Sequence, residues 1–177
     1  MGEPPSPTPA ATAEPSPVDG PVVVGADEQD AVTIDVDRWV DLARAVLRDE
    51  GRRGELTLTF VDPDEIAGLN AEHLAGDGPT DVLSFPLDDD PQPGVPVLLG
   101  DVVVCPAVAA DQAPAHAGTL DDELALLVVH GVLHVLGHDH ADDDEAAEMR
   151  GRELALLERH HWHGVAPAAF RQDHEDA

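Results

Sequence analysis

Residues 119–140 read TLDDELALLVVHGVLHVLGHDH, and this stretch predicts the centre of the fold. A threonine with three acidic residues among the next four positions is typical of a helix start, because the threonine can cap the helix and the dipole favours acids in its first turn. From Leu124 to Leu136 the residues are almost all apolar, which predicts a buried central helix. Gly137 follows, and glycine can adopt the positive φ of a helix C-terminal turn. We therefore expect a buried helix that starts at Thr119 and ends at Gly137.

Two histidines interrupt this apolar helix, and others follow its end. His130 and His134 are four residues apart, so both side chains project from one face and can reach one metal ion. A turn at Gly137 could bring His140 back as a third ligand, whereas His138 would take that place only if the helix continued. Three nitrogen ligands leave one tetrahedral position open, as a catalytic zinc requires. Unpartnered imidazoles would be costly in an apolar helix, so the pattern indicates a zinc site more than packing.

The spacing of the three histidines also occurs in the metzincin peptidases, which carry a glutamate directly after the first histidine as general base. In this chain that position is Gly131. The metal geometry is therefore similar, while the proton acceptor of a peptidase is missing. Asp139 is the candidate catalytic residue, either as a base or as a carboxylate that orients a ligand histidine. It could equally do no more than cap the turn.

The rest of the chain alternates between strand and helix patterns. Apolar or alternating runs predict strands at 21–24, 55–61, 82–85 and, in one or two pieces, 97–104, with 32–35 as an extended stretch or strand. Capped helical patterns predict helices at 37–48, 62–73, 106–116 and 142–161. This grouping predicts an α/β (α+β) domain, with a small mixed sheet packed with about five helices and the histidines on the central one.

Composition limits the function classes and the domain organisation. Nine arginines, no lysine and 37 acidic residues give a net charge of −28, which opposes non-specific attraction to phosphate or anionic membranes. No apolar run approaches the roughly 20 residues of a membrane span. Residues 1–20 are rich in proline and alanine and predict a disordered tail, residues 165–177 predict a flexible tail, and 21–164 form the predicted domain.

Cys105 is the only cysteine, so no disulfide can form within the chain, which is compatible with a cytoplasmic protein. It lies in the apolar run Asp101–Cys105 with no basic partner beside it. We interpret it as a small buried residue rather than a nucleophile.

Three motifs resemble the YbeY family, the bacterial rRNA maturation factors and zinc-dependent endoribonucleases. They are His130–His140, Gly78–Pro86 (GPTDVLSFP) and Leu99–Pro106 (LGDVVVCP), in the order that the family has them. The resemblance covers about residues 21–163. It implies a single-strand endoribonuclease that acts in 3′-end maturation of 16S rRNA and in ribosome quality control. It also implies one zinc ion on His130, His134 and His140, the small ribosomal subunit as partner, RNA rather than DNA as substrate, and a cytoplasmic location.

One departure from the family concerns the substrate. Many members carry an arginine at the position of Leu74, where it would help hold phosphate, and residues 73–78 contain no arginine or lysine here. Arg150 and Arg152 could substitute, although a solvated helix face is the simpler interpretation of both. Thr80 and Ser84 could line the cleft or be ordinary turn and strand residues.

A zinc ion at this site would lower the pKa of its bound water and polarise the scissile phosphoryl oxygen. The attacking group could be that water or the ribose 2′-hydroxyl. Two alternatives remain open: a metal-dependent hydrolase of another class with a metallopeptidase-like site, and a non-catalytic ribosome-assembly factor with a structural metal.

Overall fold

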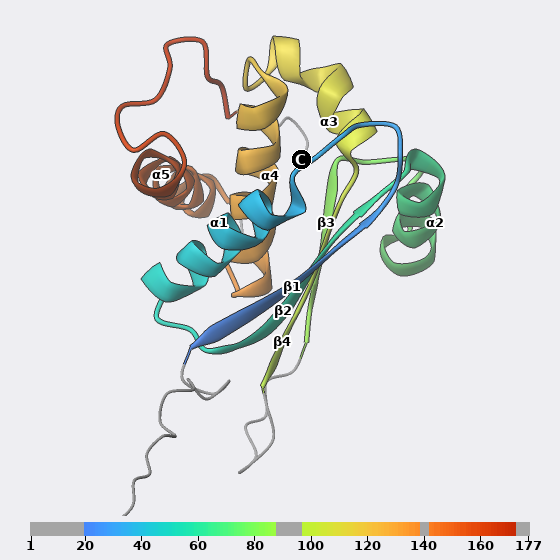
Figure 1. Ribbon diagram of the computed structural model, residues 1–177, viewed down its shortest axis with the longest axis horizontal. Helices are drawn as coiled ribbons and strands as arrows, with labels where there is room; N and C mark the ends of the chain where they lie inside the picture. Colours follow the sequence, from blue (N-terminus) through green and yellow to red (C-terminus); the bar gives the residue numbers. More distant parts are fainter. Residues whose placement is uncertain (1–19, 88–96, 139–141, 173–177) are drawn as a thin grey trace, which may run out of the picture.

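The computed structural model has a four-stranded sheet with helices on both of its faces (Figure 1). It describes residues 20–87, 97–138 and 142–172. The elements in chain order are β1 (Pro21–Glu28), α1 (Val36–Asp49), β2 (Gly54–Val61), α2 (Pro63–Leu74), β3 (Val82–Pro86), β4 (Leu98–Val104), α3 (Pro106–Gln112), the 3-10 helix η3 (Ala113–Ala115), α4 (Leu120–Val135) and α5 (Asp143–His160).

The sheet is mixed, as the sequence predicts. Its strand order is β1-β2-β4-β3, with β1, β2 and β4 parallel to one another and β3 antiparallel to β4. The helix α1 connects β1 to its parallel neighbour β2, which makes one β–α–β unit. The α/β prediction with a small mixed sheet and about five helices is confirmed.

The alternation of side chains along the strands divides the apolar residues between two cores. Leu58, Phe60 and Val102 face the larger core, which they share with α1, α4 and α5. Val61 and Val103 face the opposite side, where α2 and α3 pack. Figure 1 shows α1, α4 and α5 on one side of the sheet and α2 on the other. The helix α4 is therefore central, between the sheet and α5 (Figure 1).

The predicted limits of α4 are confirmed by its caps. Thr119 Oγ1 accepts a hydrogen bond from the backbone N–H of Asp122 at 3.1 Å. At the other end Gly137 has φ of 103°, a conformation that only glycine adopts without strain. The chain therefore leaves the helix direction two residues after Val135, before the last histidines of the motif.

Three details of the predicted elements are wrong. The first helix starts at Val36 and is capped by Asp35 instead of Asp37, since the Asp35 carboxylate accepts from the N–H of Arg38 at 3.4 Å. The helix predicted at 106–116 ends at Gln112 and gives way to a 3-10 turn, where Pro114 has no N–H to continue it. The first strand extends past the predicted Val24 to Glu28, since its full length pairs with β2.

The predicted tails lie mostly outside the described residues, which exclude 1–19 and 173–177. Residues 165–172 form no helix or strand, but Phe170 packs its ring at 4.8 Å from that of Trp162, measured between centroids. The domain limits at 20 and 164 therefore stay predictions. Within the part of the chain that the structure describes, no helix is both long and apolar enough to cross a membrane.

Candidate active site

The helix α4 presents two histidines to a cavity. Every residue from Glu123 to Val135 is buried except His130 and His134, which are partly exposed. Their ring centroids are 4.6 Å apart and the ring planes meet at 76°. The i, i+4 spacing thus places both imidazoles side by side on one exposed stripe of an otherwise buried helix.

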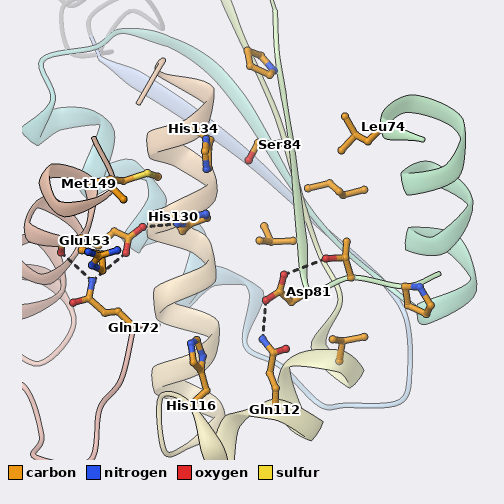
Figure 2. A pocket seen from close by; sticks show the side chains of 18 of the residues that line it. Leu74, Asp81, Ser84, Gln112, His116, His130, His134, Met149, Glu153 and Gln172 are labelled. Carbon is orange, nitrogen blue, oxygen red and sulfur yellow. Dashed lines mark hydrogen bonds and ion pairs between the residues drawn. The ribbon is translucent and has the colours of Figure 1, made fainter. Parts of the chain in front are cut away.

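The cavity beside these histidines has a volume of about 1200 Å³. Its walls come from α4, from β3 with the loop before it, from α3 and η3, and from α5 (Figure 2). Thr80 and Ser84 both belong to its lining, as the sequence allowed. Ser84 is also a structural residue, because its hydroxyl donates to the Gly131 carbonyl of α4 at 3.0 Å and so ties β3 to the histidine helix.

The carboxylate of Glu153 on α5 holds His130 in place. Glu153 is only 2% exposed, and its Oε2 lies 2.5 Å from His130 Nδ1 (Figure 2). Its other oxygen accepts from Gln172 Nε2 at 3.1 Å. An ionised carboxylate can only accept, so His130 Nδ1 carries the hydrogen and Nε2 keeps the lone pair that a metal needs.

Glu153 is not among the site residues predicted from the sequence, although a signal for it exists. On α5 the buried residues are Met149, Glu153, Leu156 and Leu157, which share the spacing of one helix face. A glutamate at a core position of an amphipathic helix indicates a buried polar partner, since an unpaired buried charge is costly.

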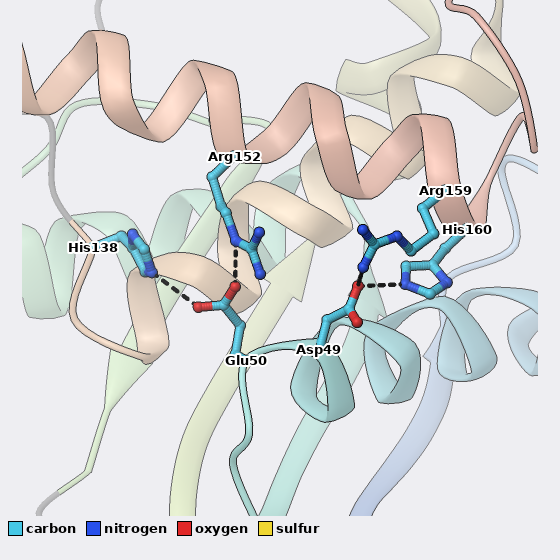
Figure 3. Close-up of polar contacts among 6 residues, drawn as sticks. All are labelled: Asp49, Glu50, His138, Arg152, Arg159 and His160. Carbon is cyan, nitrogen blue, oxygen red and sulfur yellow. Dashed lines mark hydrogen bonds and ion pairs between the residues drawn. The ribbon is translucent and has the colours of Figure 1, made fainter.

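The two remaining candidates, Asp139 and His140, lie outside the described residues. Within residues 20–87, 97–138 and 142–172 no group of three or more metal-ligating side chains occurs. His138 is described, and its Nε2 lies 3.2 Å from Glu50 Oε1 at the end of α1, whereas Glu50 Oε2 accepts from Arg152 Nε at 2.5 Å (Figure 3). His138 does not line the cavity, so its geometry disfavours it as a replacement for His140.

The donor set on α4 fits a transition metal. Imidazole nitrogens are usual zinc ligands, and a metal-bound histidine almost always donates its other N–H to a carboxylate, carbonyl or water. His130 makes that contact with Glu153, and His134 stands one helical turn away on the same cavity wall. The described residues therefore fit two of the three ligands that the sequence predicts.

At the position of the peptidase glutamate, Gly131 packs against the core and leaves no space for a side chain. A Cβ on Gly131 would lie 2.6 Å from Val102 Cγ1 and 3.3 Å from Val82 Cγ2, both on neighbouring strands. Contacts below 3.0 Å require the neighbours to shift, and here they are buried or packed strand residues. Residue 131 thus faces the sheet rather than the cavity, and a glutamate there would have no room to act as a base.

A second buried carboxylate, Glu123, supports two residues that line the cavity, Gln112 and His116. Glu123 is fully buried and accepts from Gln112 Nε2 at 2.7 Å and from the N–H of Ala117 at 3.1 Å, and it lies 2.9 Å from His116 Nδ1. The Gln112 amide also donates to Asp81 at 2.7 Å (Figure 2). This network joins α3, α4 and the loop before β3, which fixes the shape of the wall around the histidines.

Of the other candidates, Leu74 and Arg150 line the cavity, whereas Arg152 and Cys105 do not. Leu74, which is 52% exposed, lines the cavity across from α4 (Figure 2), and Arg150 lines it from α5. Arg152 is paired with Glu50 and does not belong to the lining. Cys105 is fully buried, and burial raises the pKa of its thiol, which agrees with a packing role rather than a nucleophile.

Comparison with known proteins gives a consistent result. The family described as Endoribonuclease YbeY matches residues 25–161. An Endoribonuclease YbeY from Salinispora tropica is 46% identical over 136 residues, which cover 70% of this chain and 87% of that protein. One from Mycolicibacterium paratuberculosis is 42% identical over 159 residues, or 85% of this chain and 86% of that protein.

A solved structure agrees with these sequences. The solution structure of TM1509 from Thermotoga maritima matches with a TM-score of 0.56 at 25% identity, over 88% of this chain and 100% of that one. The resemblance drawn from the three motifs thus extends over the whole domain.

Proposed function

This chain belongs to the endoribonuclease YbeY family, and from that membership we propose that it cleaves single-stranded RNA at the α4 cavity with one zinc ion. The family places it among the enzymes that hydrolyse phosphodiester bonds within RNA. The finer assignment is 3′-end maturation of 16S rRNA and ribosome quality control, with the small ribosomal subunit as partner and the cytoplasm as location.

The observation that carries the proposal is the pair His130 and His134 on the cavity wall, with His130 fixed by the buried Glu153. Together with His140 they would hold the zinc ion. When bound, it would supply Lewis-acid polarisation of a phosphoryl oxygen and a lowered pKa of coordinated water. Asp139 is proposed as the base or as a further orienting carboxylate.

The chain's own groups have three tasks in this proposal. Glu153 selects the tautomer of His130 and would leave its Nε2 available to a zinc ion. Ser84 and the network around Glu123 hold β3, α3 and α4 at fixed separations, so that the cavity keeps its width. The cavity, at about 1200 Å³, has the volume for more than one nucleotide beside the histidines.

The two alternatives fit the geometry less well. A peptidase would need a base at residue 131, which the β-sheet fills. A purely structural ion would be enclosed by protein ligands, whereas His130 and His134 line a large cavity.

The test combines metal analysis of the purified protein with cleavage of a single-stranded RNA. We expect about one zinc per wild-type chain, and loss of both zinc and cleavage in His130→Ala and His134→Ala. His163→Ala is the matched control, because His163 is exposed and outside the cavity lining. Undiminished cleavage by a variant shown to be metal-free would refute the metal-dependent reaction.

A further inference from the structure

Arg150 brings a positive charge to the wall of the cavity. It lies on α5, and the residues of α5 that line the cavity are Ala146, Met149, Arg150 and Glu153. Ala146, Arg150 and Glu153 are spaced by four and three residues and so lie on one face of the helix, with Met149 beside them. Arg150 therefore belongs to the same helix face as the residue that fixes His130, and its place there follows from helix geometry.

The guanidinium of Arg150 is not used by the fold. Four other arginines pair with carboxylates in the described residues: Arg38 with Asp121, Arg44 with Asp41, Arg152 with Glu50, and Arg159 with Asp49. Over those same residues no hydrogen bond or ion pair of the Arg150 side chain occurs, and the residue is exposed. Only its backbone carbonyl is engaged, as acceptor from Gln172 Nε2 at 2.9 Å.

The negative charge of the molecule makes a cation on the cavity wall important for RNA binding. The chain carries −28 overall, and α5 begins with Asp143, Asp144 and Glu145, so the approach of an RNA backbone is repelled. Residues 73–78, on the opposite side of the cavity, contain no arginine or lysine. A guanidinium offers a planar set of donors that matches two phosphate oxygens at once.

We propose that Arg150 binds a backbone phosphate of the RNA strand in the cavity, next to the bond that is cleaved. This inference rests on the proposed function and adds the substrate contact that it lacks. It also distinguishes two arginines that the sequence left equivalent. Arg150 binds the substrate, whereas Arg152, on another face of the same helix, pairs with Glu50 and stabilises the fold.

The test measures RNA affinity and turnover separately. Arg150→Gln, Arg150→Lys and Arg150→Glu are compared with wild type on a labelled single-stranded RNA oligonucleotide. Dissociation constants are taken on chelator-treated protein, and KM and kcat on the zinc-loaded enzyme. Arg159→Gln is the matched control, because it removes one arginine from the same helix outside the cavity lining.

We expect Arg150→Gln to raise Kd and KM about tenfold, the value of one charge-assisted contact, with kcat within about threefold of wild type. Arg150→Glu should bind more weakly still, Arg150→Lys should recover part of the affinity, and zinc content should stay unchanged. The slope of log affinity against log salt should become shallower by about 0.7, the value for one phosphate on a single strand. Arg159→Gln should match wild type in each measurement.

The outcomes separate this inference from the proposed function. If the zinc-loaded wild type cleaves no single-stranded RNA, the proposed function fails. If it cleaves and Arg150→Gln keeps the wild-type Kd and salt slope, Arg150 binds no phosphate. A fall in kcat alone, or weaker binding with an unchanged salt slope, also overturns the inference. Because Arg150 is exposed, the variants should fold, and melting curves will verify it.

Discussion

Removal of the Glu153 carboxylate should weaken metal binding without any change to a ligand. In Glu153→Ala, His130 Nδ1 loses the oxygen that lies 2.5 Å away, so the orientation and the tautomer of the imidazole are less constrained. The metal would then have to select one orientation of the ring from several. Binding should therefore be weaker, although both histidines of α4 remain.

The magnitude follows from the kind of contact that is lost. Carboxylates that orient metal-bound histidines contribute about 10- to 100-fold to metal affinity. Glu153 is 2% exposed, so solvent screens its contact with His130 little. We expect a loss near the upper end for Glu153→Ala, about 2.7 kcal/mol. Glu153→Gln keeps an acceptor but not the charge, and should lose about tenfold, since a charged acceptor is roughly twice as strong as a neutral one.

The assay is competition for zinc against a chromophoric chelator, with apo-protein melting measured in parallel. Glu123→Gln is the matched control: it alters another buried carboxylate that contacts a cavity-lining histidine, His116. We expect it to lower the melting temperature while zinc affinity stays near wild type. If Glu153→Ala binds zinc as tightly as wild type, Glu153 does not orient a ligand. Equal loss of affinity in Glu123→Gln would mean that both act through general stability.

Three further predictions concern stability. Gly131→Ala should lower the free energy of unfolding by about 1–3 kcal/mol, because the added Cβ overpacks against Val102. Chemical denaturation measures this value, and a result equal to wild type would contradict the prediction. The His160 hydrogen bond lowers the pKa of Asp49, so its stabilisation is present above about pH 4 and disappears as the pH falls through the lowered value. Asp49→Asn should then cost up to about 1 kcal/mol at pH 5 and progressively less as the pH is lowered, by melting curves across this range; a cost that does not change with pH would contradict the linkage. Glu50→Ala should lower the free energy of unfolding by about 1–3 kcal/mol, because the partly buried donors of Arg152 and His138 lose their acceptor. A urea midpoint equal to that of wild type would show that these contacts contribute nothing.

The features that the sequence predicted well are those carried by local patterns. The cap at Thr119, the end of α4 at Gly137 and the shared face of His130 and His134 each depend on residues within a few positions of one another. Helix geometry alone converts such patterns into positions in space. The family resemblance rested on equally local motifs, and it extends over the whole domain.

The features that the sequence did not predict depend on contacts between distant segments. Glu153 is 23 residues from His130, and only the packing of α5 on α4 brings them together. Arg150 and Arg152 look alike in sequence, and the rotation of α5 about its axis decides which one reaches the cavity. The first helix shows the same limit on a smaller scale: its pattern predicts a start at residue 37, whereas Asp35 caps it in the structure, and either aspartate could start a helix locally.

The contact between Gln172 and Glu153 has a practical consequence for experiments on this chain. A purification tag fused directly after Gln172 would start close to the carboxylate that fixes His130. Such a tag could change zinc content or RNA turnover although every histidine is intact. Two preparations that differ only in the position of the tag would then differ in activity. An N-terminal tag enters ahead of β1, which contributes no residue to the cavity, and is the safer fusion for every measurement proposed above.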